Sequence, residues 1–412
     1  MNGSRVQKIL NIINVGNMLF DPHLFITTLK NCLPRDQASI ALHEPLFVGN
    51  EWRYVKECLD TGWVSSGGKF VDRFESDLAA YTGAKYCVVA VNGTAALHII
   101  FLLAGVKPND EVLVPALTFI GTCNAIAYCS GISHFIDSEE SHLDIDFEKL
   151  ERYLSEITEI KNNVCFNKIT KRPIRALCVM HTFGHPVDLD TAIALCDRYH
   201  LTLIEDAAEA LGSFYKGQHV GHHGFAGALS FNGNKIITTG GGGAIITDDE
   251  DVAKKAKHIT TTAKLPHHWK YDYDCIGYNY RLPNINAALG CAQLEKIPEF
   301  LQKKRQLMER YKRIFENYNG CRFVEEPKEA KSNCWLNAIL LSDAAQHHRN
   351  DVLELACKNN IFLRPVWELM NTLPMYQRCP HMDLSGAKSV AARLINIPSS
   401  VCLSEEPVCE KY

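Results

Sequence analysis

The chain contains no apolar run of the roughly 20 residues that a membrane-spanning helix needs. Its most apolar helical stretch, residues 95–104, has about half that length. A second apolar run, residues 9–20, follows Arg5 and Lys8, but three asparagines interrupt it and no small-x-small cleavage site comes after it. We therefore expect no membrane span. We interpret residues 9–20 as an amphipathic helix packed on the body or on a neighbouring subunit, with a membrane-surface position as the alternative.

Strong net charge and paired cysteine motifs are also missing. The formal net charge is -4, which gives no electrostatic reason to expect nucleic acid or an anionic membrane as a partner. None of the sixteen cysteines belongs to a C-x-x-C pair and most lie in apolar runs, so we expect reduced, buried thiols in a cytoplasmic protein. We expect no metal ion, because the adjacent histidines lack the spacing of metal ligands: His222-His223, His267-His268 and His347-His348.

What the chain does contain is a lysine between a serine and four consecutive glycines. Residues 227–245 have the sequence GALSFNGNKIITTGGGGAI, which places Lys235 five residues after Ser230. A lysine can form a Schiff base with a carbonyl cofactor, and a serine hydroxyl with nearby backbone amides can hold a phosphate. Pyridoxal 5'-phosphate (PLP) carries both groups. A surface lysine before a glycine turn is the alternative, so the PLP interpretation depends on other segments.

Three strand-like runs end in residues that suit the same cofactor. One ends in Asp206, which could pair with the pyridine nitrogen and keep it protonated, although capping a helix is the commoner role of such an acid. Another leads through an Asn-Gly turn into a helix expected near Thr94, so that the amides of Thr94 and Ala95 form a phosphate site. The third delivers Phe119 to the same sheet edge, where an aromatic ring could stack on the pyridine or simply pack in the core.

Together these segments resemble the DegT/StrS-type sugar-nucleotide aminotransferases, a branch of the fold-type I PLP enzymes. The resemblance extends from about Pro45 to Pro398. It includes four further segments, residues 61–70, 181–186, 277–282 and 364–370. By this resemblance Lys235 would be the Schiff-base lysine and Asp206 the partner of the pyridinium nitrogen. The remaining cofactor residues that it implies are Ser230, Thr94 and Ala95 at the phosphate, Phe119 on the ring, Glu209 near the 3-hydroxyl, and Asn279 reaching the phosphate from a second subunit.

The resemblance also implies a homodimer with shared active sites and an aminotransferase that moves an amino group from glutamate to a nucleotide-linked keto sugar. Two departures matter. Glu209 stands where many members have glutamine or histidine, and a carboxylate beside a phenolate oxygen is costly unless it is protonated or paired. Residues 368–371 stand where a histidine is common. With the opening residues 42–50, this variant looks most like the subgroup that aminates C4 of UDP-linked 4-keto-6-deoxy-N-acetylglucosamine.

Three alternatives stay open at this point. The first is a C3-directed, GDP-sugar or dTDP-sugar aminotransferase of the same family. The second is a PLP-dependent sugar dehydratase of the same fold, although those relatives have histidine at the position of Lys235. The third is a regulatory protein on this fold, which would be expected to have lost Lys235 or Asp206.

The pattern of apolar runs predicts an α/β fold. Residues 61–283 alternate short apolar runs with helical segments, which favours a mostly parallel, seven-stranded-type sheet with helices on both faces. Residues 1–60 are predicted to form an N-terminal helical arm. Residues 284–412 are predicted to form a smaller α+β domain, beginning with one long helix over residues 284–318.

Overall fold

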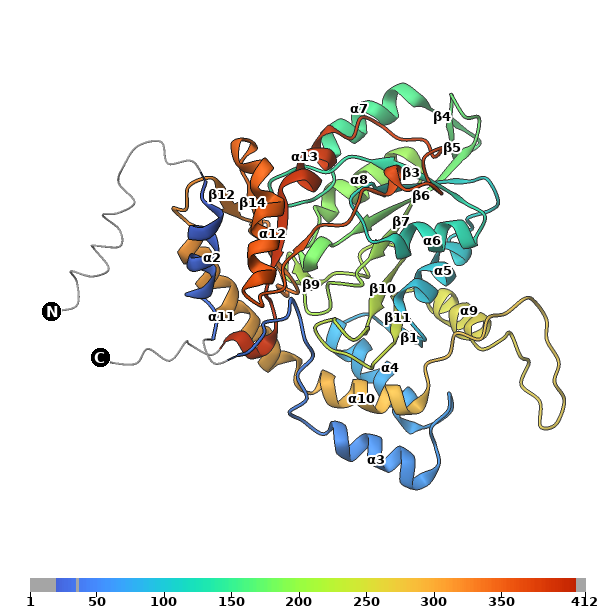
Figure 1. Cartoon of the computed structure of the whole chain (residues 1–412). Coiled ribbons are helices and arrows are strands. Elements are labelled where there is room, and N and C mark those ends of the chain that lie inside the picture. The colour runs from blue at the N-terminus through green and yellow to red at the C-terminus, as the bar shows by residue number, and fades with distance from the viewer. Residues whose placement is uncertain (1–19, 35–36, 405–412) are drawn as a thin grey trace.

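The computed structural model describes residues 20–34 and 37–404 (Figure 1). The amphipathic helix predicted over residues 9–20 lies outside the described residues, apart from Phe20, which is buried. Within the described part of the chain, no helix has both the length and the apolar character to cross a membrane.

A nine-stranded sheet forms the centre of the molecule (Figure 1). Its strands are β1 (Tyr86–Ala90), β2 (Glu111–Pro115), β3 (Ile132–Ile136), β4 (Thr158–Lys161), β5 (Val164–Asn167), β6 (Pro173–Met180), β7 (Thr202–Asp206), β10 (Ala226–Ser230) and β11 (Gly243–Thr247). Seven of them follow the order β1-β11-β10-β7-β6-β2-β3, and the β4–β5 hairpin adds to the edge of β6. The five strands from β10 to β3 are parallel, whereas β11 runs antiparallel to both of its neighbours, β10 and β1. The predicted, mostly parallel sheet is confirmed.

Helices cover both faces of this sheet (Figure 1). They are α4 (Lys69–Thr82), α5 (Gly93–Leu103), α6 (Ile120–Tyr128), α7 (Phe147–Ile157), α8 (Leu189–Tyr199) and α9 (Glu250–Thr260). Outside α4 lie α10 (Asn284–Leu294) and then α3 (Glu51–Thr61). In α4, Phe70, Phe74 and Leu78 recur every four residues and are buried on one face. Gly83 ends α4 in the left-handed conformation, at φ 78°, which glycine adopts without steric cost.

A smaller antiparallel sheet forms a second layer, with strands in the order β12-β14-β16-β15. Its elements are α11 (Ile297–Phe315), β12 (Cys321–Phe323), β14 (Asn337–Leu341), α12 (Arg349–Lys358), β15 (Arg364–Pro365), α13 (Ser385–Arg393) and β16 (Leu394–Ile397). The N-terminal α2 (Pro22–Lys30) joins this unit, because its buried Phe25 and Leu29 pack in the same apolar cluster as Leu307 and Tyr311 of α11.

Short elements complete the chain. A three-stranded sheet joins β8 (Phe214–Tyr215) to β9 (Gln218–His219) and to β13 (Ala330–Lys331). Four 3₁₀ helices are also present: η1 (Thr182–Gly184), η2 (Asp343–His348), η3 (Met370–Thr372) and η4 (Val401–Ser404).

The single long helix predicted over residues 284–318 is wrong, because two helices occupy that range. α10 ends at Leu294 and α11 begins at Ile297, with Pro298 in the first turn of α11. Proline fits the first turn of a helix but has no N–H to donate inside one. α10 packs on α3 and α4 with the larger core, and α11 continues into the smaller one.

Candidate active site

A cavity of about 380 Å³ opens where the parallel strands end. Six of the eight residues that the sequence singled out line it: Thr94, Phe119, Asp206, Glu209, Ser230 and Lys235. Ligands of open α/β sheets bind at this edge, outside the carboxyl ends of the strands. The topology therefore brings together residues that are distant in sequence.

Neighbouring strands place the two ends of the cavity. Asp206 ends β7 and Ser230 ends β10, and these strands pair in parallel. Thr94 lies in the first turn of α5, directly after β1. A Cβ atom on Gly93 would lie 3.1 Å from Cβ of Ser230, so the absence of a side chain lets α5 begin close to that serine. First-turn amides of a helix lack intrahelical partners and favour anions.

Ala95 differs from its predicted role in one respect. Its amide donates to Oδ1 of Asn92, the residue that caps α5, at 2.7 Å. Ala95 is buried, and it does not line the cavity. Its assignment as a phosphate ligand stays a prediction.

Asp206 is held by two donors that fix its carboxylate. The Thr122 hydroxyl donates to Oδ2 at 2.6 Å, and the Ala208 amide donates to Oδ1 at 3.1 Å. Burial raises the pKa of Asp206, and these hydrogen bonds together with the positive charge of Lys235 oppose the rise. Thr122 was missed from the sequence, although it lies only three residues after Phe119, at the start of α6.

Lys235 and Glu209 form a buried ion pair. The Lys235 Nζ atom lies 3.2 Å from Oε1 of Glu209, whose Oε2 accepts the Phe183 amide at 2.9 Å. Burial raises the pKa of Glu209, and the charge of Lys235 opposes that rise. The carboxylate is thus paired with the free lysine in this structure.

Aromatic rings line the rest of the cavity. Phe119 is half exposed and its ring meets that of Trp367 edge-on, with centroids 6.3 Å apart. Trp335 faces the amine of Lys235, with its ring centroid 3.9 Å from Nζ. The sequence analysis gave Trp335 no part in the site.

The donors of this cavity fit PLP. A primary amine and a carboxylate suit the cofactor's aldehyde and its pyridine nitrogen, and two hydroxyls with the first turn of α5 suit its phosphate. The shape agrees, because a Cβ atom on Gly121 would lie 2.8 Å from Oγ1 of Thr94 and 3.1 Å from the Phe119 ring. Any side chain at position 121 would fill the space between those two groups.

Asn279 lies outside this cavity. It belongs to residues 261–283, which project from the body between α9 and α10 (Figure 1). Asn279 is exposed, and its Oδ1 accepts from Nε and NH2 of Arg281 at 3.1 and 2.9 Å. On either side of it, Tyr278 and Tyr280 stack on one another with ring centroids 5.2 Å apart and also pack against His98. These rings fix the backbone that carries Asn279.

Residues 47–411 match the model of the DegT/DnrJ/EryC1/StrS aminotransferase family. The chain belongs to this family. GDP-perosamine synthase of Escherichia coli O157:H7 is 36% identical over 370 residues, which cover 90% of this chain and 95% of that enzyme. UDP-4-amino-4,6-dideoxy-N-acetyl-beta-L-altrosamine transaminase of Campylobacter jejuni is 34% identical over 279 residues, or 68% of this chain and 70% of that one. The crystal structure of the aminotransferase TlmJ from Streptoalloteichus hindustanus has the same fold, with a TM-score of 0.80, 24% identity, and coverage of 89% of this chain and 95% of that one.

Membership in the family confirms the class of enzyme and its cofactor. The protein is a PLP-dependent sugar-nucleotide aminotransferase with the fold-type I architecture predicted from the sequence. The cavity described above is the part of this chain whose donors fit that cofactor.

A second polar network surrounds Glu205, the residue before Asp206 in β7, and stabilises the loop of residues 221–224. Glu205 is fully buried and accepts amide hydrogen bonds from Gly221, His223 and Gly224 at 2.6, 2.7 and 3.0 Å. Burial alone would raise the pKa of Glu205, but the hydrogen bond and charge of His181, the charge of His223 and the Gly221 amide lower it to about 2.

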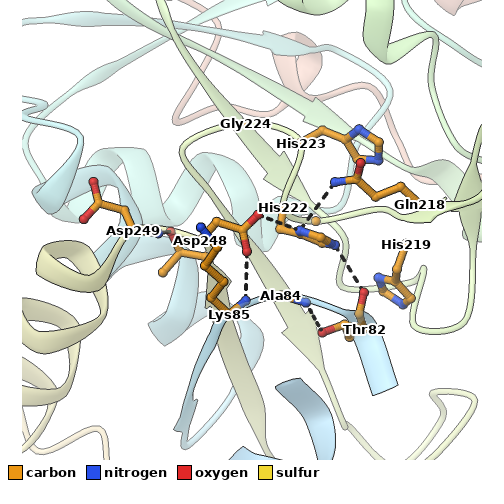
Figure 2. Close-up of polar contacts among 12 residues, drawn as sticks. Thr82, Ala84, Lys85, Gln218, His219, His222, His223, Gly224, Asp248 and Asp249 are labelled. Atoms are coloured by element: carbon orange, nitrogen blue, oxygen red, sulfur yellow. Dashed lines mark hydrogen bonds and ion pairs between the residues drawn. The ribbon is translucent and has the colours of Figure 1, made fainter. Parts of the chain in front are cut away.

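The histidine pair next to this loop has a structural role. Figure 2 shows His222 between Asp248 and the carbonyl of Thr82, each 3.2 Å from one of its ring nitrogens. These contacts tie the end of α4 to the end of β11.

A different group, His258, Asp274 and Cys275, brings ligand atoms within 4.8 Å of one another in the described chain. It lies at the surface, away from the cavity, and His258 is already bonded to Asp274 at 2.7 Å.

Proposed function

We propose that this enzyme transfers the amino group of glutamate to C4 of a nucleotide-linked 4-keto-6-deoxy sugar. The first candidate substrate is UDP-4-keto-6-deoxy-N-acetylglucosamine. The observation that supports the proposal is the meeting of Lys235, Asp206 and Ser230 in one cavity at the ends of adjacent strands.

The residues would divide the binding of PLP between them. Lys235 would bind the aldehyde carbon, and Asp206 would hold the proton on the pyridine nitrogen. Phe119 would stack on the cofactor's pyridine ring, and Glu209 would lie near the cofactor's 3-hydroxyl. Thr94 and Ser230, with Ala95 in the first turn of α5, would hold the phosphate. When bound, PLP supplies an electron-withdrawing ring and a carbon that accepts and returns the amino group.

Lys235 would also carry the proton that the reaction moves. Its Nζ takes a proton from the substrate carbon in the first half-reaction and returns one to the sugar carbon in the second. The Glu209 carboxylate, 3.2 Å away in this structure, would keep the amine at one end of the cavity. Both substrates use the same cavity in turn, so the steady-state kinetics should be ping-pong.

The choice of nucleotide is the finer part of the proposal. Residues 42–50 and 368–371 favour the UDP-linked substrate by resemblance. A GDP-linked sugar is the second candidate, because the relative named for GDP-perosamine matches 90% of this chain whereas the relative named for a UDP sugar matches 68%. Turnover should be measured against a panel of UDP-, GDP- and dTDP-linked keto sugars with glutamate. NMR of the product then identifies the aminated carbon, and amination at C3 would overturn the C4 assignment.

We further propose that the working unit is a homodimer in which Asn279 enters the partner's cavity. The projecting segment carries Trp269, Tyr271 and Ile276, which are 77%, 74% and 83% exposed in the single chain. Large apolar side chains gathered on a projecting segment are typical of an interface between proteins. A two-fold interface makes the exchange reciprocal, so each dimer would have two composite sites.

We also propose that the protein works in the cytoplasm. The cysteines of the described residues form no disulfide with one another, and most of these thiols are buried. Reduced cysteines in this number suit a reducing compartment.

An absorbance spectrum and an analysis of the product would distinguish this enzyme from a regulatory protein and from a sugar dehydratase. The purified aminotransferase should show a visible absorbance band that borohydride removes, and the band should change when glutamate alone is added. A regulatory protein that does not bind the cofactor would show no band, and a dehydratase would release a sugar nucleotide without a new amino group.

A further inference from the structure

The Lys235 amine lies between a carboxylate and an aromatic face. Its Nζ atom is 3.2 Å from Oε1 of Glu209 and 3.9 Å from the ring centroid of Trp335. A lysine ammonium over the face of tryptophan gains more from the ring quadrupole than over any other side chain, and it gains most where water is excluded. The Lys235 side chain is 13% exposed and Trp335 is 4% exposed, so this contact is largely dry.

The position of the Trp335 indole is fixed at both ends. Its Nε1–H donates to the carbonyl of Asn234 at 2.7 Å, which ties the ring to the residue before the lysine. At the other end, the Trp335 amide donates to Oδ1 of Asn333 at 2.8 Å, and its carbonyl accepts from Lys304 at 3.0 Å. The two backbone bonds fix the residue that carries the ring, and the ring cannot turn away from the cavity without breaking its bond to Asn234.

The same short segment also fixes the backbone that carries the Glu209 carboxylate. Asn333 Nδ2 donates to the carbonyls of Glu209 and Leu211 at 2.8 and 2.9 Å. Gly184, at φ +93°, makes room for this contact, because a Cβ atom there would lie 1.9 Å from Oδ1 of Asn333. Residues 333–335 thus carry the indole and anchor the backbone of Glu209, whose carboxylate pairs with the Lys235 amine.

Besides the Trp335 ring, several charged and titratable groups lie near the Lys235 amine. Glu209 and Asp206 attract the ammonium from the floor of the cavity. Behind Trp335 lie His43, with ring centroids 6.4 Å apart, and Lys304. Burial, together with the charges of Lys304 and Lys235, lowers the pKa of His43 well below its ordinary value. His43 is therefore neutral near pH 7, and the Trp335 face is the group that the ammonium meets on that side.

We propose that Trp335 is a positioning residue that holds the Lys235 ammonium against Glu209 while the lysine carries a proton and is not bonded to the cofactor. This role rests on the proposed function. In each half-reaction the lysine is released from the cofactor and must keep its amine near the reacting carbons. An ammonium without the indole face would be free to move toward Asp206, the other carboxylate of the cavity.

The test measures the reactivity of Lys235 in the full-length protein freed of PLP. An amine reagent is applied at pH 7 and at pH 10, and mass spectrometry gives the labelling rate of the peptide that contains Lys235. Only the neutral amine reacts. The labelling rate at pH 7 divided by the rate at pH 10 is therefore lower the more strongly the ammonium is stabilised. Trp335→Leu should raise this ratio by about 2- to 30-fold, which is the range of a cation–π contact. Trp367→Leu, which alters a tryptophan of the same cavity away from the amine, should leave it unchanged.

A second variant covers failure of Trp335→Leu to fold. A fluorinated tryptophan at position 335 keeps the shape and the Nε1–H of the indole but weakens its negative face, so the ratio should rise with the number of fluorine atoms. An unchanged ratio in this series, or in a folded Trp335→Leu protein, would overturn the proposal. If the labelling rate rose by the same factor at both pH values, the proposal would also be overturned, because the ring would then only shield the amine from the reagent. The labelling needs neither cofactor nor substrate, so failure of the proposed function would appear instead as a borohydride label away from Lys235.

Discussion

The Thr122 hydroxyl donates a 2.6 Å hydrogen bond to the Asp206 carboxylate, and both groups are buried. Thr122 lies in the first turn of α6, the helix that Phe119 caps. One helix terminus therefore positions the ring proposed to cover the cofactor and orients the acid proposed to hold its pyridine nitrogen.

Thr122→Val should slow the half-reaction with glutamate about tenfold, since a hydrogen bond to a charged group contributes roughly 1.5–3 kcal/mol and only part of that is lost on the way to the transition state. Single-turnover kinetics measure this rate directly. Thr118→Val is the matched control, because Thr118 is equally buried and contacts Thr122 and Met180 but not Asp206. Equal rates in the two variants would show that the Thr122 bond does not serve the reaction.

Asp206→Asn should slow the same half-reaction at least about 100-fold, the loss typical of removing a group that stabilises developing charge. The amide keeps the shape of the side chain but cannot hold the pyridine nitrogen protonated. Stopped-flow absorbance on mixing with glutamate is the measurement. An unchanged rate would place the partner of the pyridine nitrogen elsewhere.

Mixed dimers should recover activity if Asn279 serves the partner's site. When Lys235→Ala subunits are mixed with Asn279→Ala subunits, one of the two composite sites in each heterodimer carries both wild-type residues. Turnover of the mixture, compared with each variant alone, is the readout. If heterodimers form and Asn279→Ala is itself inactive, an inactive mixture would show that each subunit builds its site alone.

Lys304 should make stability depend on pH. It is fully buried, and its Nζ donates to carbonyls of Trp335 and Ser399 at 3.0 and 2.5 Å without a carboxylate partner in the described chain. Burial lowers its pKa from 10.5 to about 7. Between these two values the unfolded chain binds more protons than the folded one, so this lysine costs less stability as the pH rises.

The variant Lys304→Met tests that sign. Relative to wild type, its free energy of unfolding should fall by about 2 kcal/mol between pH 7 and pH 9, because the cost of burying the charged lysine is lost from wild type over that range. Denaturant unfolding at the two pH values measures it. Lys303→Met is the control, since Lys303 pairs with Glu299 at the surface. A constant difference between Lys304→Met and wild type would contradict the lowered pKa.

Much of the site could be predicted from the sequence, because its residues end apolar strands or begin helices. Asp206 and Ser230 end β7 and β10, and Thr94 follows β1, as the local patterns indicated. Trp335 could not be found in this way. It lies 101 positions from Asn234, to which its indole is bonded, and an apolar pattern does not show that one ring turns toward a distant lysine. The break between α10 and α11 was predictable, since Pro298 marks it.

Removal of the Lys235 amine should separate binding from reaction. Lys235→Ala should reduce turnover below about one hundredth of wild type, because general acid–base groups contribute roughly 100- to 10,000-fold. The variant should still bind PLP noncovalently through Asp206 and the phosphate residues, which equilibrium dialysis would show. Turnover of Lys235→Ala above about one hundredth of wild type would mean that another group moves the proton.

Borohydride trapping tests the role of Lys235 most directly. The reagent reduces the bond between a lysine nitrogen and the cofactor's aldehyde carbon, so the cofactor stays attached to whichever lysine held it. Peptide mass spectrometry of the reduced wild-type protein should find the cofactor on the peptide that contains Lys235, and Lys235→Ala should carry none. A label on another lysine, or a borohydride-sensitive visible band that persists in Lys235→Ala, would contradict the assignment of Lys235 as the residue that binds PLP.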